Sequence, residues 1–570
     1  MQLRLSRAEP KLPQGARHVL PCRRLVQAAC LSAFLILFFY VCWPYGSRQY
    51  AQAFHGREIV DAEIFLLLDP LVSLSTAIAA KMFVWCLIPA IGVILFCIVF
   101  PRAFCGYMCP LGTLFDGFDW LVSRRVRRLA WEREGWWIHL RYYLLAAVFA
   151  AAAFGVLLSG FVAAIPVLTR AMLFILAPVQ IGLFKGWYLV PPMNPGHVLS
   201  ILLFVLMFCL GFFGRRFWCR HVCPTGALFS VVNALRLTER RVTGACIKCG
   251  KCLSACSFAA IKDDFSTRPL TCTSCRTCRR ACPAGAIRFA WRWTPAEASS
   301  HARNVSPGAV VSRRGVLAGL GSAAVAGAGA SLAAGRTSGA SDVNLPIRPP
   351  GSVPESQFLQ LCVRCGQCIK ACPNNVLQSA GLEHGFNGLW TPKVVPDWSG
   401  CEPTCNNCGQ VCPTGAVRAL TLEEKRAARI GLAQVNQQIC LPYAGRETCQ
   451  LCVDECRVAG YDAIEFIRVG SELDEEGKPI EDRGRLAPVV WADRCVGCGL
   501  CQMRCHAINV KVKELLPRSA IQVTAGEGKE DRIMSGSYIA LRDELAKRPD
   551  SQKSDQGQDA AGEYLPDFLR

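Results

Sequence analysis

The sequence predicts an α-helical membrane bundle joined to small α+β domains that are rich in cysteine. Three observations support this fold class. Long apolar runs occupy the N-terminal part of the 570-residue chain, 34 cysteines gather mainly in two later regions, and one cysteine motif occurs twice beside the apolar runs. Hydrophobic residues make up 52% of the chain, which is high for a soluble protein and indicates membrane spans.

Four apolar runs are long enough to cross the ~30 Å hydrocarbon core of a bilayer as helices. They cover residues 25–43, 82–101, 140–165 and 197–213. Two further apolar segments, 64–80 and 173–184, contain Asp69-Pro70 and Pro178. We expect these two segments to be re-entrant or interfacial, with an extra pair of spans as the alternative. The prediction is therefore a bundle of four spans.

The formal net charge of +20 comes in part from arginines that flank the apolar runs, for example at residues 123–128 and 214–216. This placement follows the positive-inside rule, which puts the N-terminus, the 102–139 loop and the segment after residue 213 in the cytoplasm. A nucleic-acid-binding protein would instead carry a basic face on a folded module. We therefore expect a membrane topology signal and no nucleic-acid partner.

The duplicated motif is FCGYMCPLGTLF at residues 104–115 and WCRHVCPTGALF at residues 218–229. Each copy follows the second span of a predicted hairpin, so the membrane unit is predicted to have a two-fold repeat with a functional site at the repeat interface. The copies supply Cys105, Cys109, Cys219 and Cys223. These four thiols are candidates for a redox role, either as ligands of a metal centre or as a redox disulfide. Packing at the helix ends is the structural alternative.

Twenty-four of the remaining cysteines follow the spacing C-x2-C-x2-C-x3-C or a stretched form of it. In bacterial ferredoxins, three close cysteines of such a run bind one [4Fe–4S] cluster and the fourth binds the neighbouring cluster. Structural zinc uses paired C-x2-C knuckles, and a disulfide framework has no reason to repeat one eight-cysteine pattern three times. The later regions are therefore predicted to be ferredoxin-like [4Fe–4S] domains.

The cysteine runs form three consecutive pairs, and the two runs of each pair exchange their fourth cysteines. This gives six sets of four cysteines, which we number by the position of the first cysteine in the chain. They are set 1 (Cys246, Cys249, Cys252, Cys282), set 2 (Cys272, Cys275, Cys278, Cys256), set 3 (Cys362, Cys365, Cys368, Cys412), set 4 (Cys401, Cys405, Cys408, Cys372), set 5 (Cys440, Cys449, Cys452, Cys505) and set 6 (Cys495, Cys498, Cys501, Cys456). Six [4Fe–4S] clusters are the predicted cofactors.

Changes in composition divide the chain into domains. We predict a cytoplasmic tail over residues 1–24, a membrane domain over 25–238, a cytoplasmic two-cluster domain over 239–292, a linker over 293–340, a four-cluster domain over 341–523 and a polar, partly disordered tail over 524–570.

The linker contains SRRGVL at residues 312–317, followed by a Gly/Ala-rich run without charge. This fits a twin-arginine export signal, which exports proteins already folded around their cofactors. We therefore expect the four-cluster domain to be periplasmic. The run at 316–334 would anchor the chain as a fifth span or be cleaved near Ala330, and a flexible cytoplasmic linker is the alternative.

Residues 20–290 resemble the NapH-type membrane ferredoxins of periplasmic nitrate reductase systems, through their spans, Cys-x3-Cys-Pro motifs and two cluster motifs. Residues 310–520 resemble the NapG-type partner, most clearly in YAGRETC at 443–449 and GYDAI at 460–464. The resemblance implies oxidation of quinol and delivery of electrons to a periplasmic reductase. This chain departs from the family by joining both parts, and by Ser257, Arg457 and His506 where the cluster run often ends in proline.

No C-x-x-C-H haem site and no credible dinucleotide-binding motif occur in the sequence, so quinol is the natural electron source for a membrane protein. We predict an integral protein of the bacterial inner membrane that takes electrons from the quinone pool and passes them to a periplasmic reductase, dehydrogenase or cytochrome c. Arg170, Lys185 and His197 are candidates for quinone contact. The alternative is an assembly or maturation factor that reduces copper or thiols for a respiratory enzyme.

One difficulty follows from this topology. Clusters on opposite sides of a ~30 Å core lie too far apart for a single electron-transfer step. Either the quinone or a further centre lies between them, or the cytoplasmic pair serves a separate branch.

Overall fold

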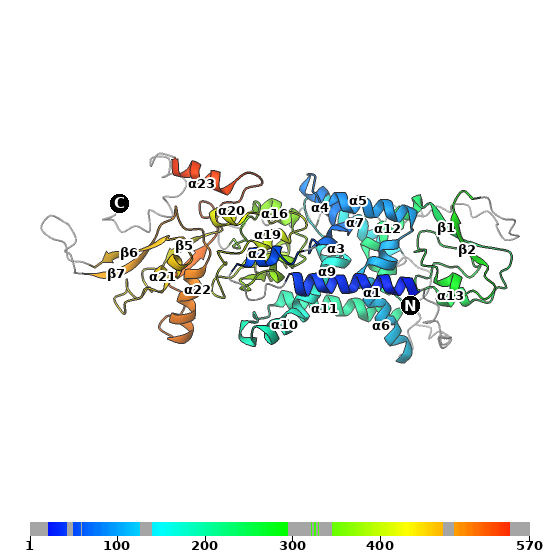
Figure 1. Ribbon diagram of the computed structural model, residues 1–570, viewed down its shortest axis with the longest axis horizontal. Coiled ribbons are helices and arrows are strands. Elements are labelled where there is room, and N and C mark those ends of the chain that lie inside the picture. The colour runs from blue at the N-terminus through cyan, green and yellow to red at the C-terminus, as the bar shows by residue number, and fades with distance from the viewer. Residues whose placement is uncertain are drawn as a thin grey trace.

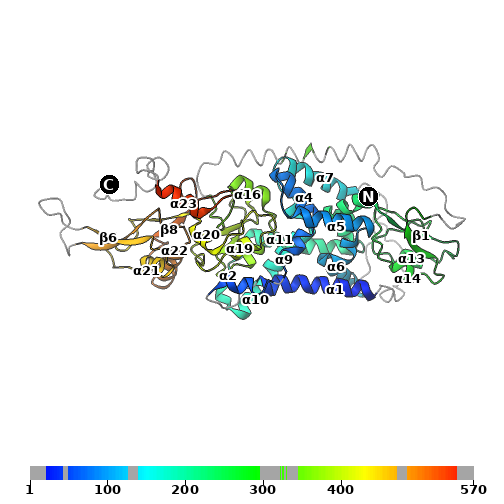
Figure 2. The same ribbon diagram turned by 45° about the horizontal axis from the view of Figure 1, so that its top comes forward.

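The computed structural model describes residues 21–42, 49–58, 60–125, 139–294, 321, 324–325, 329, 345–470 and 484–547. The molecule is elongated, and a helical unit lies between two cysteine-rich domains, one at each end (Figures 1 and 2). We call residues 238–294 the inner domain and residues 345–547 the outer domain. The twin-arginine sequence at 312–317 and the expected cleavage site near residue 330 lie outside the described residues.

The helical unit contains most of the apolar sequence. Its elements are α1 (Pro21–Ile36), η2 (Leu37–Val41), α3 (Ile64–Leu67), α4 (Pro70–Ala80), α5 (Leu87–Val99), η3 (Phe104–Met108), α6 (Pro110–Arg125), α7 (Leu140–Ala153), α8 (Ser159–Val162), α9 (Ala164–Ile175), α10 (Ala177–Phe184), η5 (Trp187–Leu189), α11 (Pro195–Cys209), η6 (Leu210–Phe213), η7 (Trp218–Val222), α12 (Pro224–Val232) and η8 (Asn233–Leu235).

Three helical stretches among the described residues are long and apolar enough to cross a membrane: Cys22–Val41, Ala164–Phe184 and Pro195–Phe213. The first and third overlap the predicted spans at 25–43 and 197–213. The predicted span at 82–101 contains only the 13-residue helix α5. The three stretches indicate membrane association.

Two of the sequence-based predictions for this unit are revised by the structure. The predicted span at 140–165 is interrupted, because α7 ends at Ala153 and Gly155 turns the chain with a φ of 79°. The segment at 173–184 belongs to the 21-residue apolar stretch Ala164–Phe184, which fits the alternative of a further span better than the first expectation of an interfacial segment. Pro178 does not break this stretch, because it lies in the first turn of α10. Backbone N–H groups in the first turn have no acceptor within the helix, so the N–H that proline lacks is not needed there.

Large apolar side chains cover the outside of the helical unit. Leu25, Leu95, Leu183 and Leu202 are each more than half exposed, at 69%, 58%, 70% and 59%. An exposed apolar surface of this kind marks contact with lipid or with another protein. Together with the long apolar helices, it indicates that the surface around the bundle faces lipid.

The inner domain is built on one antiparallel strand pair, β1 (Thr238–Val242) and β2 (Ile287–Trp291), in which Arg240 lies opposite Phe289. Two short helices, α13 (Lys251–Ala255) and α14 (Thr277–Ala281), lie between these strands in the sequence. The two helices contact each other. This arrangement brings the two cysteine runs of the domain together.

The outer domain contains three antiparallel strand pairs and short helices. Its elements are α16 (Glu355–Leu361), α17 (Gln367–Lys370), β3 (Leu377–Ser379), α18 (Gly385–Gly388), β4 (Pro392–Val394), α19 (Asn407–Gln410), α20 (Leu422–Ala427), β5 (Leu432–Val435), α21 (Leu451–Val458), β6 (Ile464–Val469), β7 (Arg485–Val490), α22 (Leu500–Cys505), η9 (His506–Val512), β8 (Ile521–Thr524) and α23 (Tyr538–Lys547). The pairs are β3–β4, β5–β8 and β6–β7.

Two distant segments complete the outer domain. Helix α2 (Tyr50–His55) from the N-terminal part packs on it, and the N–H of Ala51 donates to the carbonyl of Thr404. The polar segment that follows β8 turns back in α23, whose Tyr538 is fully buried and donates its backbone N–H to Glu424. The outer domain is therefore completed by a segment that follows the first apolar stretch and by a segment near residue 547.

Candidate functional site

The loops that carry the cysteines repeat one backbone conformation. In sets 1, 2, 3 and 6, the residues immediately before and after the second cysteine both have positive φ: Lys248 and Gly250, Ser274 and Arg276, Arg364 and Gly366, and Gly497 and Gly499. Such left-handed residues turn successive N–H groups toward one side and form a concave anion site. A cluster held by four thiolates is an anion, so these loops fit the predicted cofactor.

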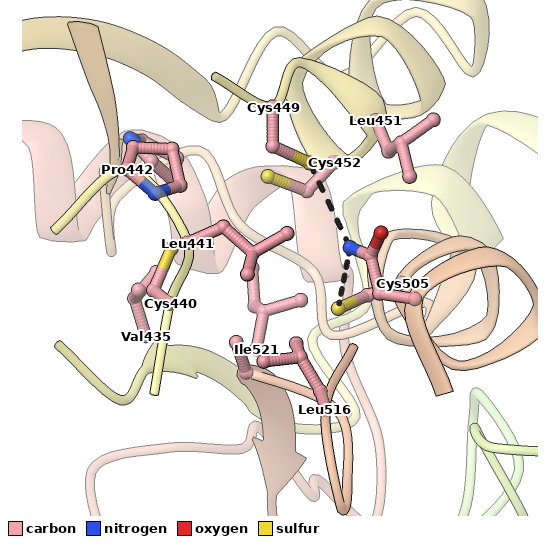
Figure 3. Close-up of a pocket in the computed structure, with 13 residues that line it drawn as sticks. Val435, Cys440, Leu441, Pro442, Cys449, Leu451, Cys452, Cys505, Leu516 and Ile521 are labelled. Carbon is pink, nitrogen blue, oxygen red and sulfur yellow. Dashed lines mark hydrogen bonds between the residues drawn. The ribbon is translucent and has the colours of Figure 1, made fainter. Parts of the chain in front are cut away.

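Two of the sets line cavities. Cys440, Cys449, Cys452 and Cys505 of set 5 surround about 370 Å³ that protein atoms do not fill (Figure 3). The side-chain amide of Asn509 donates to Cys449 and Cys505 there, at 3.7 Å to each sulfur. All four cysteines of set 1 line a second pocket, in the inner domain.

The structure also brings the cysteines of the other four sets together. In each of them, one thiol lies within electrostatic interaction distance of its three predicted partners. These central thiols are Cys278 in set 2, Cys368 in set 3, Cys408 in set 4 and Cys501 in set 6. The fourth ligand of each set comes from the neighbouring run, as the ferredoxin pattern predicts.

The chemistry of the donors distinguishes between possible occupants. All 34 cysteines are free thiols, so the sets are not disulfides. Within the described residues, no group of three or more His, Cys, Asp or Glu side chains is placed to hold a single metal ion. A multi-iron cluster holds its thiolates farther apart than one tetrahedral ion does, because each sulfur binds a different iron. The sets therefore fit iron–sulfur clusters better than zinc.

The four sets of the outer domain form a continuous row. Cys368 of set 3 lies near Cys408 of set 4, and Cys501 of set 6 lies near Cys452 of set 5. Between these pairs, the backbone N–H of Cys401 in set 4 donates to the carbonyl of Cys498 in set 6 at 2.7 Å. The order from the membrane helices outward is therefore set 3, set 4, set 6 and set 5.

Backbone amides donate to several of the fourth ligands. The N–H groups of Ala260 and Ala463 point at the sulfurs of Cys256 and Cys456, each at 3.3 Å. Both cysteines precede residues that replace the usual proline, Ser257 and Arg457. Hydrogen bonds to ligand sulfurs help to set cluster potentials. The replacements therefore leave this amide contact in place.

The outer domain is joined to the membrane helices at set 3. The guanidinium of Arg364, two residues after Cys362, donates to the carbonyl of Leu157 at 2.8 Å. Val363 and Cys365 belong to the same buried cluster as residues of the long apolar helices, including Phe34 and Leu168. An ideal Cβ on Gly160 would lie 2.5 Å from the carbonyl oxygen of Val363, so the two backbones pack in direct contact.

The inner domain meets the opposite end of the helices at set 2. The side-chain amide of Asn233 donates to the carbonyl of Cys272 at 3.0 Å, and Arg102 donates to the carbonyl of Thr271 at 3.3 Å. Phe258, two residues after Cys256, lies beneath the guanidinium groups of Arg102 and Arg216, at 5.7 and 4.7 Å from its ring centre. Polar and cation–π contacts dominate this junction.

The four redox candidates Cys105, Cys109, Cys219 and Cys223 also lie together, packed in the main buried cluster. Arg102 and Arg216 occupy equivalent places, three residues before the first cysteine of each repeat. These two arginines are not among the site residues expected from the sequence, although their matched positions in the repeat are a signal that could have identified them.

The three quinone-contact candidates all lie near the outer junction. Arg170 is 1% exposed, donates to Ser200 at 3.0 Å, and lies over the Trp390 ring at 3.8 Å from its centre. Lys185 donates to the carbonyl of Pro373 at 2.7 Å. His197 accepts from the N–H of Asn194 in the cap of α11. The structure thus places Arg170 and Lys185 in contact with the outer domain at separate points, and His197 in the cap of α11.

Two charged groups of the outer domain were also missed from the sequence. Lys425 is 4% exposed, donates to the carbonyl of Glu402 at 2.6 Å, and lies close to ligands of sets 4 and 6. Burial would raise the pKa of Glu355, but its ion pairs with Arg348 and Arg532, at 2.6 Å each, outweigh burial and hold that pKa below its usual value. Single lysines and glutamates carry no sequence pattern that would reveal such roles.

Comparisons with known proteins agree with this geometry. A model described as a 4Fe-4S binding domain matches residues 82–128 and 196–242, and a second with the same description matches 243–259, 269–285 and 492–508. A 4Fe-4S dicluster domain model matches residues 361–416. No solved structure matches the chain.

Several curated proteins are similar to part of the chain. The ferredoxin-type protein NapG of Escherichia coli is 38% identical over 183 residues, which cover 32% of this chain and 74% of NapG. The methylamine utilization ferredoxin-type protein MauM of Paracoccus denitrificans is 36% identical over 176 residues, which cover 30% of this chain and 71% of MauM. The putative electron transport protein YccM of Escherichia coli is 28% identical over 198 residues, covering 34% of this chain and 52% of YccM.

The ligand loops, the grouped thiols and these relatives lead to the same conclusion. The chain carries multiple [4Fe–4S] sites and transfers electrons. It belongs to the family of ferredoxin-type iron–sulfur proteins that includes NapG and MauM.

Proposed function

We propose that the protein is a quinol dehydrogenase of the bacterial inner membrane. In this proposal the six cysteine sets hold six [4Fe–4S] clusters, the inner domain is cytoplasmic and the outer domain is periplasmic. The electron acceptor is a periplasmic oxidoreductase or a cytochrome c. The resemblance of residues 20–290 to NapH-type proteins is included in this proposal, since the relatives reported above are NapG, MauM and YccM.

One observation carries the proposal: set 3 is built into the membrane unit. Cys365 and Val363 share a buried cluster with the membrane helices, and Cys362 belongs to another that contains Val84 and Cys86 of the helical unit. A donor dissolved in the lipid can therefore reach the first set of the row without leaving the membrane. The other end of the row, at set 5, is the end available to a partner in the aqueous phase.

Arg170 is the strongest candidate for contact with the quinol. Its Nη2 is buried and has no hydrogen-bond partner among the described residues, whereas its Nη1 donates to the carbonyls of Gly160 and Arg364, at 2.8 and 3.2 Å. Arg364 lies in the ligand loop of set 3. A cationic donor at this place would hold a quinol oxygen beside that loop and would stabilise negative charge as the hydroxyl loses its proton.

The oxidation of one quinol to a quinone releases two electrons and two protons. Each bound cluster supplies a one-electron acceptor, so two acceptors are needed for each quinol. The adjacent sets 3 and 4 provide such a pair. The acceptor protein at the end of the row takes up the two electrons, and the protons are released on the side where the quinol binds.

A quinol assay tests the proposal. The full-length protein, reconstituted in lipid with its clusters oxidised, is mixed with a reduced quinol, and cluster bleaching is followed by absorbance. We expect bleaching within a catalytic turnover time for the wild type and for Lys393→Gln, which removes only the surface ion pair with Glu383. Arg170→Gln should slow bleaching at least tenfold without loss of iron.

Absence of bleaching with intact clusters would contradict the proposal and favour the assembly or maturation role, in which the electrons reduce copper or thiols. A reporter fused after residue 570 tests the topology separately. We expect the fusion to show alkaline phosphatase activity, because this reporter is active only outside the cytoplasm and the proposal places the outer domain there.

A further inference from the structure

The inner domain carries a large excess of positive charge. Its residues 238–294 include eleven Lys and Arg but only three Asp and Glu, so its formal net charge is +8. The outer domain, residues 345–547, has 23 Lys and Arg against 24 Asp and Glu, a formal net charge of −1. Both domains contain cysteine sets of the same type. Cluster binding alone therefore does not explain the charge of the inner domain.

The negative charge available within the inner domain does not cancel this excess. A [4Fe–4S] cluster held by four thiolates adds about two negative charges, so two clusters leave the domain positive. Of the three carboxylates, Glu239 pairs with Arg236 and Arg241, at 3.3 and 3.1 Å. Asp263 and Asp264 lie in an exposed turn between the two cysteine runs. The domain therefore presents a net positive surface to its surroundings.

Set 1 reaches the surface where exposed cations lie. Among the 24 predicted ligands, all of them within the described residues, Cys249 is the only exposed one. The pocket of set 1 is lined by Cys249 and by its loop neighbours Ile247 and Lys248. Ile247 is 65% exposed, and Lys248 and Lys251 are exposed as well. Neither lysine forms an ion pair with another residue that the structure describes.

The neighbouring cysteine run adds further cations around set 1. Arg279 is exposed on α14 and lies three residues before Cys282, the fourth ligand of set 1. Helix α14 contacts α13, whose first residue is Lys251. Beneath them, Arg240 is buried, lines the same pocket and lies within electrostatic interaction distance of Cys252. Both runs of the domain thus bring positive charge to set 1.

Membrane topology does not account for these cations. The positive-inside rule counts basic residues within about 15–20 residues of a span. Lys248 and Lys251 lie farther than that from Pro195–Phe213, the last described stretch before this domain that is long enough to cross a membrane. The domain meets the helices at the set 2 loop, where Asn233 donates to the carbonyl of Cys272. Set 1 is the other member of the pair, and its exposed loop is not part of this junction.

We infer that the surface around set 1 binds an acidic one-electron carrier protein. The exposed ligand Cys249 puts the cluster site at the surface, where the redox centre of a partner can approach closely. Opposite charges steer such encounters, and Ile247 offers an apolar contact at the centre of the charged surface. A nucleic acid would also be attracted by the cations, but it does not carry electrons, so the exposed ligand favours a redox protein.

The inference gives the inner domain its own entry for electrons. In each encounter the reduced carrier passes one electron to the domain and leaves oxidised, with no bond made or broken and no proton transferred. The inner domain lies at the opposite end of the molecule from the outer domain, beside which quinol is proposed to react (Figure 1). The inference therefore does not rest on the proposed function, and either one can fail without the other.

Binding of an acidic probe protein tests the inference without any quinol. The full-length protein with its clusters is placed in a lipid nanodisc, which leaves both ends accessible, and is titrated with a plant-type [2Fe–2S] ferredoxin of strongly acidic surface. Calorimetry gives the dissociation constant. We expect binding at low salt that weakens as the salt is raised from about 50 to about 300 mM, because screening reduces the attraction between exposed charges.

Two matched double variants locate the binding surface. Lys248→Glu/Lys251→Glu should retain the iron of the wild type and weaken ferredoxin binding by about tenfold or more. Lys511→Glu/Lys547→Glu makes the same change of net charge at two exposed lysines of the outer domain and should bind as the wild type does. If Lys248→Glu/Lys251→Glu loses iron, Lys251→Glu/Arg279→Glu, which leaves Lys248 in place, should give the same weakening.

Three outcomes would overturn the inference. The first is absence of ferredoxin binding to the wild type at low salt. The second is equal weakening by the inner and outer double variants, which would show that the attraction has no specific location. The third is tighter binding of a duplex oligonucleotide than of the ferredoxin at the same salt concentration, which would make the surface a nucleic-acid site.

Discussion

The two ferredoxin domains are attached to the same helical unit in different ways. The inner domain has a separate buried cluster, formed by Cys252, Ile261, Cys278 and Ile287, and meets the helices mainly through polar contacts. The outer domain shares its buried side chains with the helices, since Cys365 belongs to the main membrane cluster. The inner domain therefore contacts the surface of the helical unit, whereas the outer domain shares a buried core with that unit.

This difference has an energetic consequence. Burial of apolar surface is stabilising in proportion to the area removed from water, and close packing makes such a junction sensitive to single methyl groups. Polar contacts at a junction can be exchanged for contacts with water at a small net cost. We therefore expect changes at the outer junction to affect the whole molecule and changes at the inner junction to stay local.

The largest difference is expected for loss of one ligand in each domain. Cys365→Ser and Cys249→Ser should each remove about four iron atoms per chain. Cys365→Ser should also destabilise the chain by more than about 4 kcal/mol, because the site is part of the shared core. Cys249 is exposed, so its loss should leave the unfolding temperature of the helices unchanged. Iron analysis and thermal unfolding measure these two effects. Equal shifts of the unfolding temperature in the two variants would contradict the difference between the two domains.

The two junctions also differ in how closely the backbones approach. A methyl group on Gly160 would lie 2.5 Å from the backbone oxygen of Val363, whereas one on Gly106 would make ordinary contact with Thr273 at 3.5 Å. Gly160→Ala should therefore cost about 1–3 kcal/mol and loosen the outer domain, and Gly106→Ala should cost much less. Limited proteolysis and thermal unfolding test this. Gly92→Ala, where the added methyl meets no other atom, is the control.

The outer domain should further lose stability in acid through one carboxylate. Arg348 and Arg532 hold the pKa of Glu355 below its unfolded value, so this ion pair stabilises the domain fully above about pH 4.5. The contribution is lost as the pH falls through the lower folded-state pKa. Glu355→Gln should cost about 2 kcal/mol at neutral pH and almost nothing in strong acid. The free energy of unfolding of the wild type and of Glu355→Gln is measured as a function of pH. A difference between them that does not change with pH would show that the interpretation is wrong.

The smallest expected effect concerns potentials within the outer row. Lys425 is a buried cation near Cys401 and Cys498, so Lys425→Met should lower the potentials at sets 4 and 6 by an amount on the order of 1–2 kcal/mol per electron. The inner sets should not change. Redox titration followed by paramagnetic resonance measures this, with Lys393→Met, which removes a surface pair with Glu383, as the control.

Local spacing explains why the cysteine sites were the most predictable part of the molecule. A run such as Cys246-x2-Cys249-x2-Cys252 places three ligands within one short loop. The structure brings the four cysteines of each proposed set close together. The spans were less predictable. Hydropathy showed that residues 140–184 are apolar but not where the helix is interrupted, and the left-handed turn at Gly155 and the placement of Pro178 decided this.

The sequence alone therefore determined which residues could bind iron and which segments are apolar, because both are properties of neighbouring residues. Only the tertiary structure decided that set 3 shares a buried cluster with the helical unit and that Lys425 lies close to ligands of two sets. Burial and charge balance depend on segments brought together from distant parts of the chain, and no local pattern records them.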